Sequence, residues 1–106
     1  MAEEFVKISQ EVLTAGASPV AVASGSVEGT IVRHMRVANN SSDDTTLAMW
    51  QGGTTDAEMI LPPAMITEGG WAEFEGSIIL NGADTLYAAA GAGADLTITV
   101  YGLEMS

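Results

Sequence analysis

The residues of this chain that could do chemistry are a single histidine and a few pairs of carboxylates. His34 is the only histidine, and it would act as a general base only beside a hydroxyl nucleophile and an orienting carboxylate. The serines stand in loop-like stretches rather than in the strand–turn–helix setting of an activated nucleophile. We therefore expect His34 to be a surface or interface residue, and the sequence predicts a protein that is not an enzyme.

The carboxylate pairs are Glu73 with Glu75 and Asp43 with Asp44. Glu73 and Glu75 are two residues apart, so on a strand they share one face with roughly 7 Å between their Cα atoms. Such a pair could serve a glycosidase, but its alternation with apolar residues predicts the solvent side of a sheet. Asp43 and Asp44 could coordinate Ca²⁺, although the segment lacks the Asp-x-Asp-x-Asp-Gly order of a calcium loop. The sequence predicts no catalytic residue, no metal site and no cofactor.

The composition of the chain excludes several classes of protein. Its 106 residues match a single domain spanning 1–106, and 47% of them are hydrophobic, which predicts a folded chain. The formal net charge is −11, with 14 acidic residues against 3 basic ones, so the chain lacks the cations that nucleic acids and anionic membranes attract. The absence of cysteine excludes disulfides and thiolate metal sites. We expect no nucleic-acid partner and no membrane partner.

Short apolar runs separated by Gly, Asn, Ser and Asp predict an all-β fold. Evenly spaced runs of this kind are typical of a β-sandwich or small barrel, and we predict a single antiparallel β-sandwich, jelly-roll-like, of about eight short strands. The last run, where Leu96, Ile98 and Val100 alternate with polar residues and Tyr101, has the clearest strand pattern. The expected strands cover residues 5–14, 19–23, 30–39, 45–51, 57–65, 71–80, 85–90 and 96–104.

Prolines and glycines indicate where strands lie at an edge or bend. Pro19 at the start of one run predicts an edge strand, because proline cannot donate to a ladder. Pro62-Pro63 makes the run 57–65 either an edge strand or an extended connection. Gly76 inside the run 71–80 predicts a bulge or a corner between sheets.

The residue types in two short segments predict a turn and a loop. Asn81-Gly82 predicts a tight turn between two antiparallel strands, because both residues tolerate a positive φ. The polar run 39–44 predicts a solvent-exposed loop.

Residues 30–39 hold two of the three basic residues of the chain. On a regular strand Arg33 shares a face with apolar residues, and Arg36 lies on the opposite face. An inward Arg33 needs a carboxylate partner, and both arginines are expected contacts within the fold or with a neighbouring subunit. The candidates for the carboxylate are Glu73, Glu75 and Glu104.

Aromatic residues add three candidate interface positions. Trp50 and Trp71 each fall on the strand face opposite the apparent core set, where large aromatic side chains favour protein interfaces. A register shift by one residue would instead make them core residues. Phe5 lies in the segment 1–8, which we expect to form an arm that contacts a partner.

Four segments of the chain resemble a diffuse set of short virion proteins of tailed bacteriophages. They are residues 29–39 (Gly-Thr-Ile-Val-Arg-His-Met-Arg-Val-Ala-Asn), 71–80 (Trp-Ala-Glu-Phe-Glu-Gly-Ser-Ile-Ile-Leu), 82–88 (Gly-Ala-Asp-Thr-Leu-Tyr-Ala) and 97–104 (Thr-Ile-Thr-Val-Tyr-Gly-Leu-Glu). Proteins with this layout are small β-sandwiches that decorate phage heads or attach to tails. The resemblance covers the chain from Val20 onward.

The resemblance implies a capsid decoration (cement) protein that binds the outer surface of the head and stabilises it. The implied partners are the major capsid protein or other virion proteins, and the implied oligomer is a homotrimer. Assembly would take place in the bacterial host cytoplasm, with the finished protein located in the virion. The residues expected to make these contacts are Phe5, Arg33, Arg36, Trp50 and Trp71.

Two alternatives remain open at this point. A tail, neck or fibre-associated component would have the same fold and a far lower copy number in the virion. A carbohydrate-binding β-sandwich module would use Trp50 and Trp71 as a stacking platform, with Asn39, Asp43 or Asp44 as polar neighbours.

Overall fold

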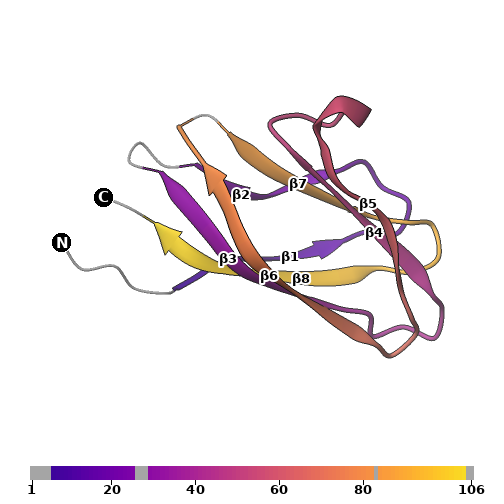
Figure 1. Ribbon diagram of the computed structural model, residues 1–106. Coiled ribbons are helices and arrows are strands. Elements are labelled where there is room, and N and C mark those ends of the chain that lie inside the picture. The colour runs from indigo at the N-terminus through magenta and orange to yellow at the C-terminus, as the bar shows by residue number, and fades with distance from the viewer. Residues whose placement is uncertain (1–5, 26–28, 83, 105–106) are drawn as a thin grey trace.

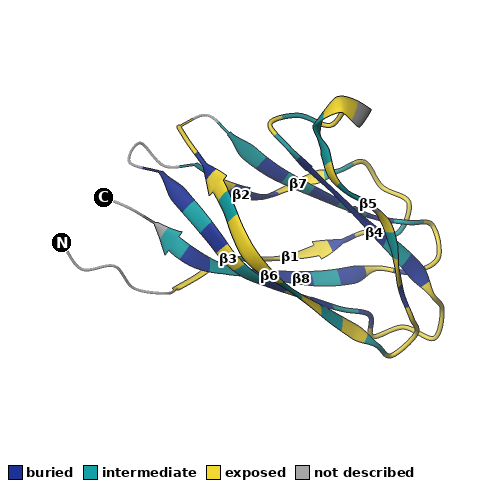
Figure 2. Ribbon diagram, in the orientation of Figure 1, coloured by how far each residue is buried: buried dark blue, intermediate teal, exposed yellow. Residues whose placement is uncertain are grey.

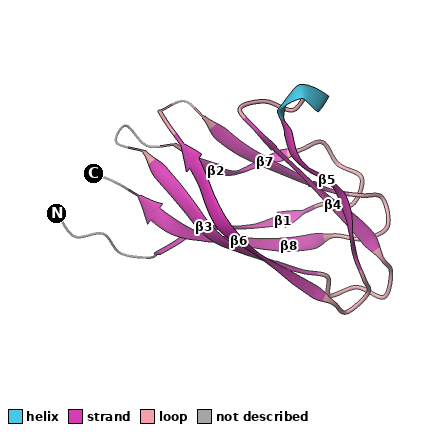
Figure 3. Ribbon diagram, viewed as in Figure 1, coloured by secondary structure: helices cyan, strands magenta, loops and turns pink. Residues whose placement is uncertain are grey.

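The computed structural model describes residues 6–25, 29–82 and 84–104, which form eight strands and one short 3₁₀ helix (Figures 1 and 3). No helix in these ranges is long and apolar enough to cross a membrane. The element bounds follow the expected runs closely. The elements are β1 (Val6–Leu13), β2 (Val20–Ser24), β3 (Thr30–Ala38), β4 (Thr45–Gln51), η1 (Asp56–Glu58), β5 (Met59–Ile66), β6 (Trp71–Leu80), β7 (Thr85–Ala90) and β8 (Leu96–Glu104).

The strands form two four-stranded sheets with the connectivity of a jelly roll. Sheet A has the order β1-β8-β3-β6, and sheet B has the order β2-β7-β4-β5. The antiparallel pairs β1–β8, β2–β7, β3–β6 and β4–β5 alternate between the two sheets. The chain is therefore one long antiparallel hairpin, bent back between β4 and β5, whose two arms wrap around a common core. This confirms the predicted antiparallel β-sandwich and its jelly-roll character.

The core lies between the sheets and is built mainly by the central strands β3, β8, β4 and β7. Figure 2 shows buried residues along these strands and exposed residues along β1, β5 and β6. In β8, Leu96, Ile98 and Val100 are at most 1% exposed, as their alternation predicts. Burial of each such aliphatic side chain stabilises the fold by about 1.5–3 kcal/mol.

The edge and bulge predictions are confirmed. β2, which directly follows Pro19, and β5, which contains Pro62-Pro63, are the two edge strands of sheet B, where a missing backbone donor does least harm. In sheet A, Val32 pairs with Ile78 and His34 with Glu75, so Arg33 alone faces two residues of β6. One of these two is Gly76, whose φ of 154° fits the bulge expected there.

The prediction that Asn81-Gly82 joins two paired strands is wrong. The turn itself is tight, with the Asp84 N–H donating to the Asn81 carbonyl at 2.8 Å and a φ of 45° at Gly82. However, it leads from β6 in sheet A to β7 in sheet B, and these strands do not pair. Turn chemistry acts locally and reverses the chain, whereas the burial of apolar faces decides which sheet the next strand joins.

The prediction of an inward-facing Arg33 is also wrong. Arg33 is exposed, while Val32 and Met35 on either side are buried. The bulge at this position inserts one residue into the alternation and moves the arginine out of the core. Arg33 and Arg36 are therefore both exposed, rather than divided between a buried and an open face.

In β1 a register shift between Lys7 and Ser9 interrupts the alternation, and Val6 and Val12 are exposed at 40% and 61%. One expectation for the loop after β3 needs correction. Asn39, expected in a solvent loop, is 1% exposed. It is buried because its side chain organises the loop from within, donating to the carbonyls of Asp43 at 2.8 Å and Ile66 at 3.1 Å.

Candidate functional site

The outer face of sheet A holds most of the side chains that the sequence marks as functional candidates. Directly paired residues on neighbouring strands lie side by side, so the register defines rows that cross the sheet. Two rows are rich in charge, and they lie between two apolar rows. From β1 across to β6, the rows contain Val12, Thr97, Ala38 and Trp71; Gln10, Thr99, Arg36 and Glu73; Lys7, Tyr101, His34 and Glu75; and, past the bulge, Leu103, Ile31 and Ile79 from β8, β3 and β6.

Arg36 connects two of these rows. Its Nη2 donates a 2.9 Å hydrogen bond to Glu73 Oε1, and its guanidinium carbon lies 5.1 Å from the centre of the Trp71 ring. A guanidinium at this distance from an indole is attracted by the ring quadrupole. Arg36 thus keeps Trp71 and Glu73 in a defined arrangement, although the Trp71 side chain is 62% exposed.

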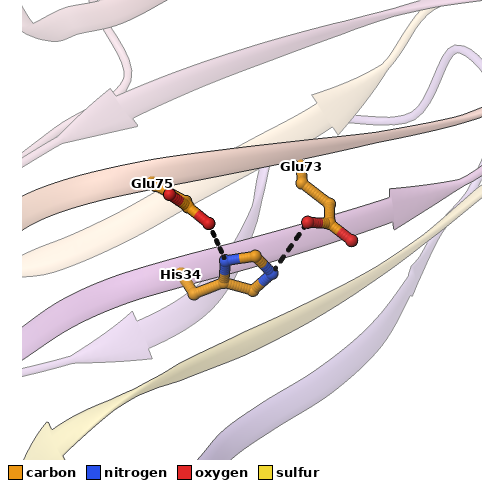
Figure 4. A group of neighbouring side chains, drawn as sticks. All are labelled: His34, Glu73 and Glu75. Carbon is orange, nitrogen blue, oxygen red and sulfur yellow. Dashed lines mark ion pairs between the residues drawn. The ribbon is translucent and has the colours of Figure 1, made fainter.

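His34 lies between two carboxylates on the same face (Figure 4). Its Nε2 is 3.6 Å from Glu73 Oε2, and its Nδ1 is 3.7 Å from Glu75 Oε1. On the opposite side, the ring of Tyr101 has its centroid 5.8 Å from that of His34, at an interplanar angle of 52°. The bulge in β3 puts His34 on the outer face, because it shifts the alternation just before this residue.

The two rims of the sandwich are closed to different degrees. At the β1–β2 rim the Ser9 hydroxyl donates to the Val22 carbonyl and so joins the two sheets. At the β5–β6 rim there is a mostly apolar cavity of about 150 Å³, lined among others by Met49, Leu61 and Phe74. The β5–β6 rim is therefore the less tightly packed of the two.

The structure brings together only some of the predicted contact residues. Arg36 and Trp71 are neighbours on the outer face of sheet A, and Arg33 is exposed further along β3, at the bulge opposite Gly76 and Ser77. Trp50 lies in sheet B and is only 9% exposed, so it is not available for a contact. A carbohydrate platform formed by Trp50 and Trp71 is therefore wrong. Phe5 and the start of the expected arm lie outside the described residues.

Sequence reasoning did not connect His34 with Glu73 and Glu75. Each of the three was identified by itself, but the pairs His34–Glu75 and Arg36–Glu73 depend on the β3–β6 register. The sequence did point to a bulge at Gly76. It would have placed the two glutamates beside His34 only if β3 and β6 had also been assumed to pair.

The exposed large hydrophobic side chains show a second pattern. Within residues 6–25, 29–82 and 84–104, every one of them lies on an edge strand of the sandwich. Edge strands of monomeric proteins are usually protected by charges or prolines rather than by apolar groups. They are Val6 and Val12 on β1, Val20 on β2, Ile60 and Met65 on β5, and Trp71 and Ile79 on β6.

Comparison with known proteins identifies the fold but no family. No family model and no curated protein sequence matches the chain. The nucleoplasmin-like N-terminal domain of Drosophila FKBP39 is 9% identical, with a TM-score of 0.56 over 98% of this chain and 92% of that one. A subunit structure of Bacillus endospore appendages, which form a novel family of disulfide-linked pili, is 15% identical, with a TM-score of 0.51 over 99% of this chain and 93% of that one. At these identities the likeness extends to the β-sandwich fold alone.

Proposed function

We propose that this protein is a bacteriophage virion structural protein, a capsid decoration (cement) protein that binds the head through the outer face of sheet A. In this proposal it acts as a homotrimer, stabilises the shell by bridging capsid subunits, and has no catalytic role. It assembles with the major capsid protein in the host cytoplasm and remains in the virion.

The observation that supports the proposal most is the first row of the outer face. Its two ends are Val12 and Trp71, which are 61% and 62% exposed, and between them lie only Thr97 and Ala38. Across four strands this row spans about 14 Å and contains no charge. A partner that covers it would bury mostly apolar area, and the nearest ion, Arg36, is already paired with Glu73 and stacked on Trp71. Apolar contact area of this kind contributes most to the free energy of association.

The rest of the surface supports the proposal that this protein is a subunit of a larger assembly. The apolar side chains on all four edge strands would be protected by neighbouring subunits, and burial against neighbours stabilises the folded state by mass action. A chain of similar fold builds the disulfide-linked pili of Bacillus endospore appendages. The present chain has no cysteine, so any assembly it forms depends on non-covalent contacts.

The test is mass determination by light scattering, followed by co-sedimentation with purified empty phage shells in their expanded form. The proposal expects a trimer that sediments with the shells and saturates at a copy number set by shell geometry. A monomer or dimer that leaves expanded shells bare would reject it. Binding to isolated tails at a few copies per virion would replace it with the tail-component alternative.

A pair of variants locates the binding face. Trp71→Ala removes the largest apolar group of the first row, whereas Met65→Ser removes an equally exposed apolar group from the edge of sheet B. We expect Trp71→Ala to weaken shell binding and Met65→Ser to leave it unchanged. If Met65→Ser weakens binding more than Trp71→Ala does, the outer face of sheet A is not the contact.

A further inference from the structure

The cluster of His34, Glu73 and Glu75 has the composition of a metal-binding site (Figure 4). Each residue offers one ligand atom, and these atoms all lie within 4.8 Å of one another. One imidazole nitrogen and two carboxylate oxygens form a mixed donor set that suits Zn²⁺ and similar divalent transition ions, while Ca²⁺ prefers oxygen ligands alone.

The distances from the His34 ring to the two carboxylates are too long for hydrogen bonds, and the shorter one is close to the spacing of two ligands on one ion. The 3.7 Å contact to Glu75 is made by the other ring nitrogen, so the Glu75 side chain has to turn to share an ion with Glu73. The separations of 3.6 Å and 3.7 Å from the ring nitrogens to the carboxylates exceed the usual 2.7–3.2 Å of a hydrogen bond. Two ligands of one tetrahedral Zn²⁺, each about 2.0–2.1 Å from the metal, stand about 3.4 Å apart. The pair formed by His34 Nε2 and Glu73 Oε2 therefore needs little movement to hold an ion between them.

Arg36 orients one of the carboxylates. Its 2.9 Å hydrogen bond occupies Glu73 Oε1 and leaves Oε2 as the oxygen nearest the His34 ring. Outer partners of this kind hold metal ligands in position. Glu75 has a 78% exposed side chain and can rotate toward an ion bound at either ring nitrogen. The charge also favours a cation, because two carboxylates lie beside one imidazole in a chain of net charge −11, and Arg36 is paired with Glu73.

We propose that His34, Glu73 and Glu75 bind one divalent transition-metal ion, with Zn²⁺ as its representative, on the outer face of sheet A. Three protein ligands leave a position of a tetrahedral ion for water or for a side chain of a neighbouring subunit. The site is independent of the shell-binding proposal, since it depends only on residues within one chain.

The test is calorimetric titration of the full chain with ZnCl₂. We expect one saturable site in the wild-type protein and at least about tenfold weaker binding in His34→Gln and in Glu73→Gln. Glu11→Gln is the matched control, because it removes the same single charge from an exposed position on β1. Equal affinities in Glu11→Gln and Glu73→Gln, or binding without saturation, would show diffuse attraction to the acidic surface and overturn the proposal.

A second measurement does not depend on any variant. His34 is the only histidine, so long-range ¹H–¹⁵N spectra report its ring nitrogens without overlap. Zn²⁺ bound at this site should shift one ring nitrogen strongly, and an equal concentration of Ca²⁺ should not. Ring signals that stay unchanged at saturating Zn²⁺ would place the ion elsewhere and reject the site.

Discussion

The guanidinium of Arg36 lies 5.1 Å from the centre of the Trp71 ring, across the paired strands β3 and β6. Arg36 comes from the second row of the outer face and Trp71 from the end of its first row. The arginine therefore links the charged part of this face to its most exposed aromatic residue. Because both side chains are more than half exposed, the contact organises a surface rather than stabilising the core.

A double-mutant cycle measures this contact. Arg36→Ala, Trp71→Ala and the double variant should show a coupling free energy of about 0.5–1 kcal/mol, the usual range for an exposed cation–π pair. Urea unfolding followed by circular dichroism gives the three stabilities. The hydrogen bond from Arg36 to Glu73 is lost in both arginine variants and so cancels from the coupling term. Strictly additive effects would mean that the arginine and the ring do not interact in solution.

The two tryptophans should differ sharply in fluorescence. Trp50 is 9% exposed and Trp71 is 62% exposed, so the variant Trp71→Phe should retain a blue-shifted emission that acrylamide quenches poorly. Trp50→Phe should retain a red-shifted emission that acrylamide quenches readily. Similar quenching constants in the two variants would contradict the different burial of these residues.

Gly102 is required by close backbone packing next to the β3 bulge. A Cβ at this position would stand 2.1 Å from the Ile31 carbonyl oxygen, and backbone cannot move as a side chain can. We expect Gly102→Ala to lower the free energy of unfolding by about 1–3 kcal/mol. In Gly53→Ala the nearest atoms to the added methyl group belong to the Glu58 carboxylate, the end of a side chain that can turn away by giving up its hydrogen bonds from Thr55, so the loss of stability should be smaller than in Gly102→Ala. Chemical denaturation gives the free energy of unfolding of both variants. Equal values for Gly102→Ala and Gly53→Ala would refute the backbone clash at Gly102.

Asn39 holds the loop between β3 and β4 through hydrogen bonds in both directions. Besides donating to Asp43 and Ile66, its Oδ1 accepts from the Ser41 N–H at 3.0 Å and the Ser41 hydroxyl at 2.9 Å. Asn39→Ala would leave the buried Ile66 carbonyl without this donor, and we expect the free energy of unfolding to fall by about 1–3 kcal/mol. The neighbouring Asn40 is exposed, so thermal unfolding of Asn40→Ala should match the wild type. A neutral Asn39→Ala would mean that water replaces the side chain.

Glu58 provides a prediction about pH. The hydroxyl and then the backbone N–H of Thr55 donate to its carboxylate, and these hydrogen bonds lower the pKa of Glu58 below its ordinary value of 4.5. Because the folded-state pKa is lowered, the stabilisation is present above pH 4.5 and is lost as the pH falls through the folded-state value. An NMR titration should show this pKa moving up toward 4.5 in Thr55→Val. The pKa of Glu58 should stay unchanged in the control variant Thr54→Val. If it is unchanged in Thr55→Val as well, Thr55 is not the cause of the lowered pKa.

The candidate site could be predicted residue by residue but not as an arrangement. The exposure of Arg36 follows from its residue type and strand position, whereas the sequence left both tryptophans open between an exposed and a buried position, and the structure separates them. The contact of Arg36 with Trp71, and the meeting of His34 with Glu73 and Glu75, depends on the pairing of β3 with β6. Those strands are separated in the chain by β4 and β5, and nothing local in either strand specifies the other as its partner.

The sequence by itself determined that this protein is all-β, nearly where its strands begin and end, and that β2 and β5 lie at edges, because alternation, glycine and proline act within a few residues. Only the tertiary structure decided which strands pair, which sheet follows the Asn81-Gly82 turn, and that Arg33 is exposed and Trp50 is buried. The bulge at Arg33 in β3 accounts for part of this difference. A bulge reverses every later side chain on its strand, and whether a strand forms one depends on the neighbour against which it pairs.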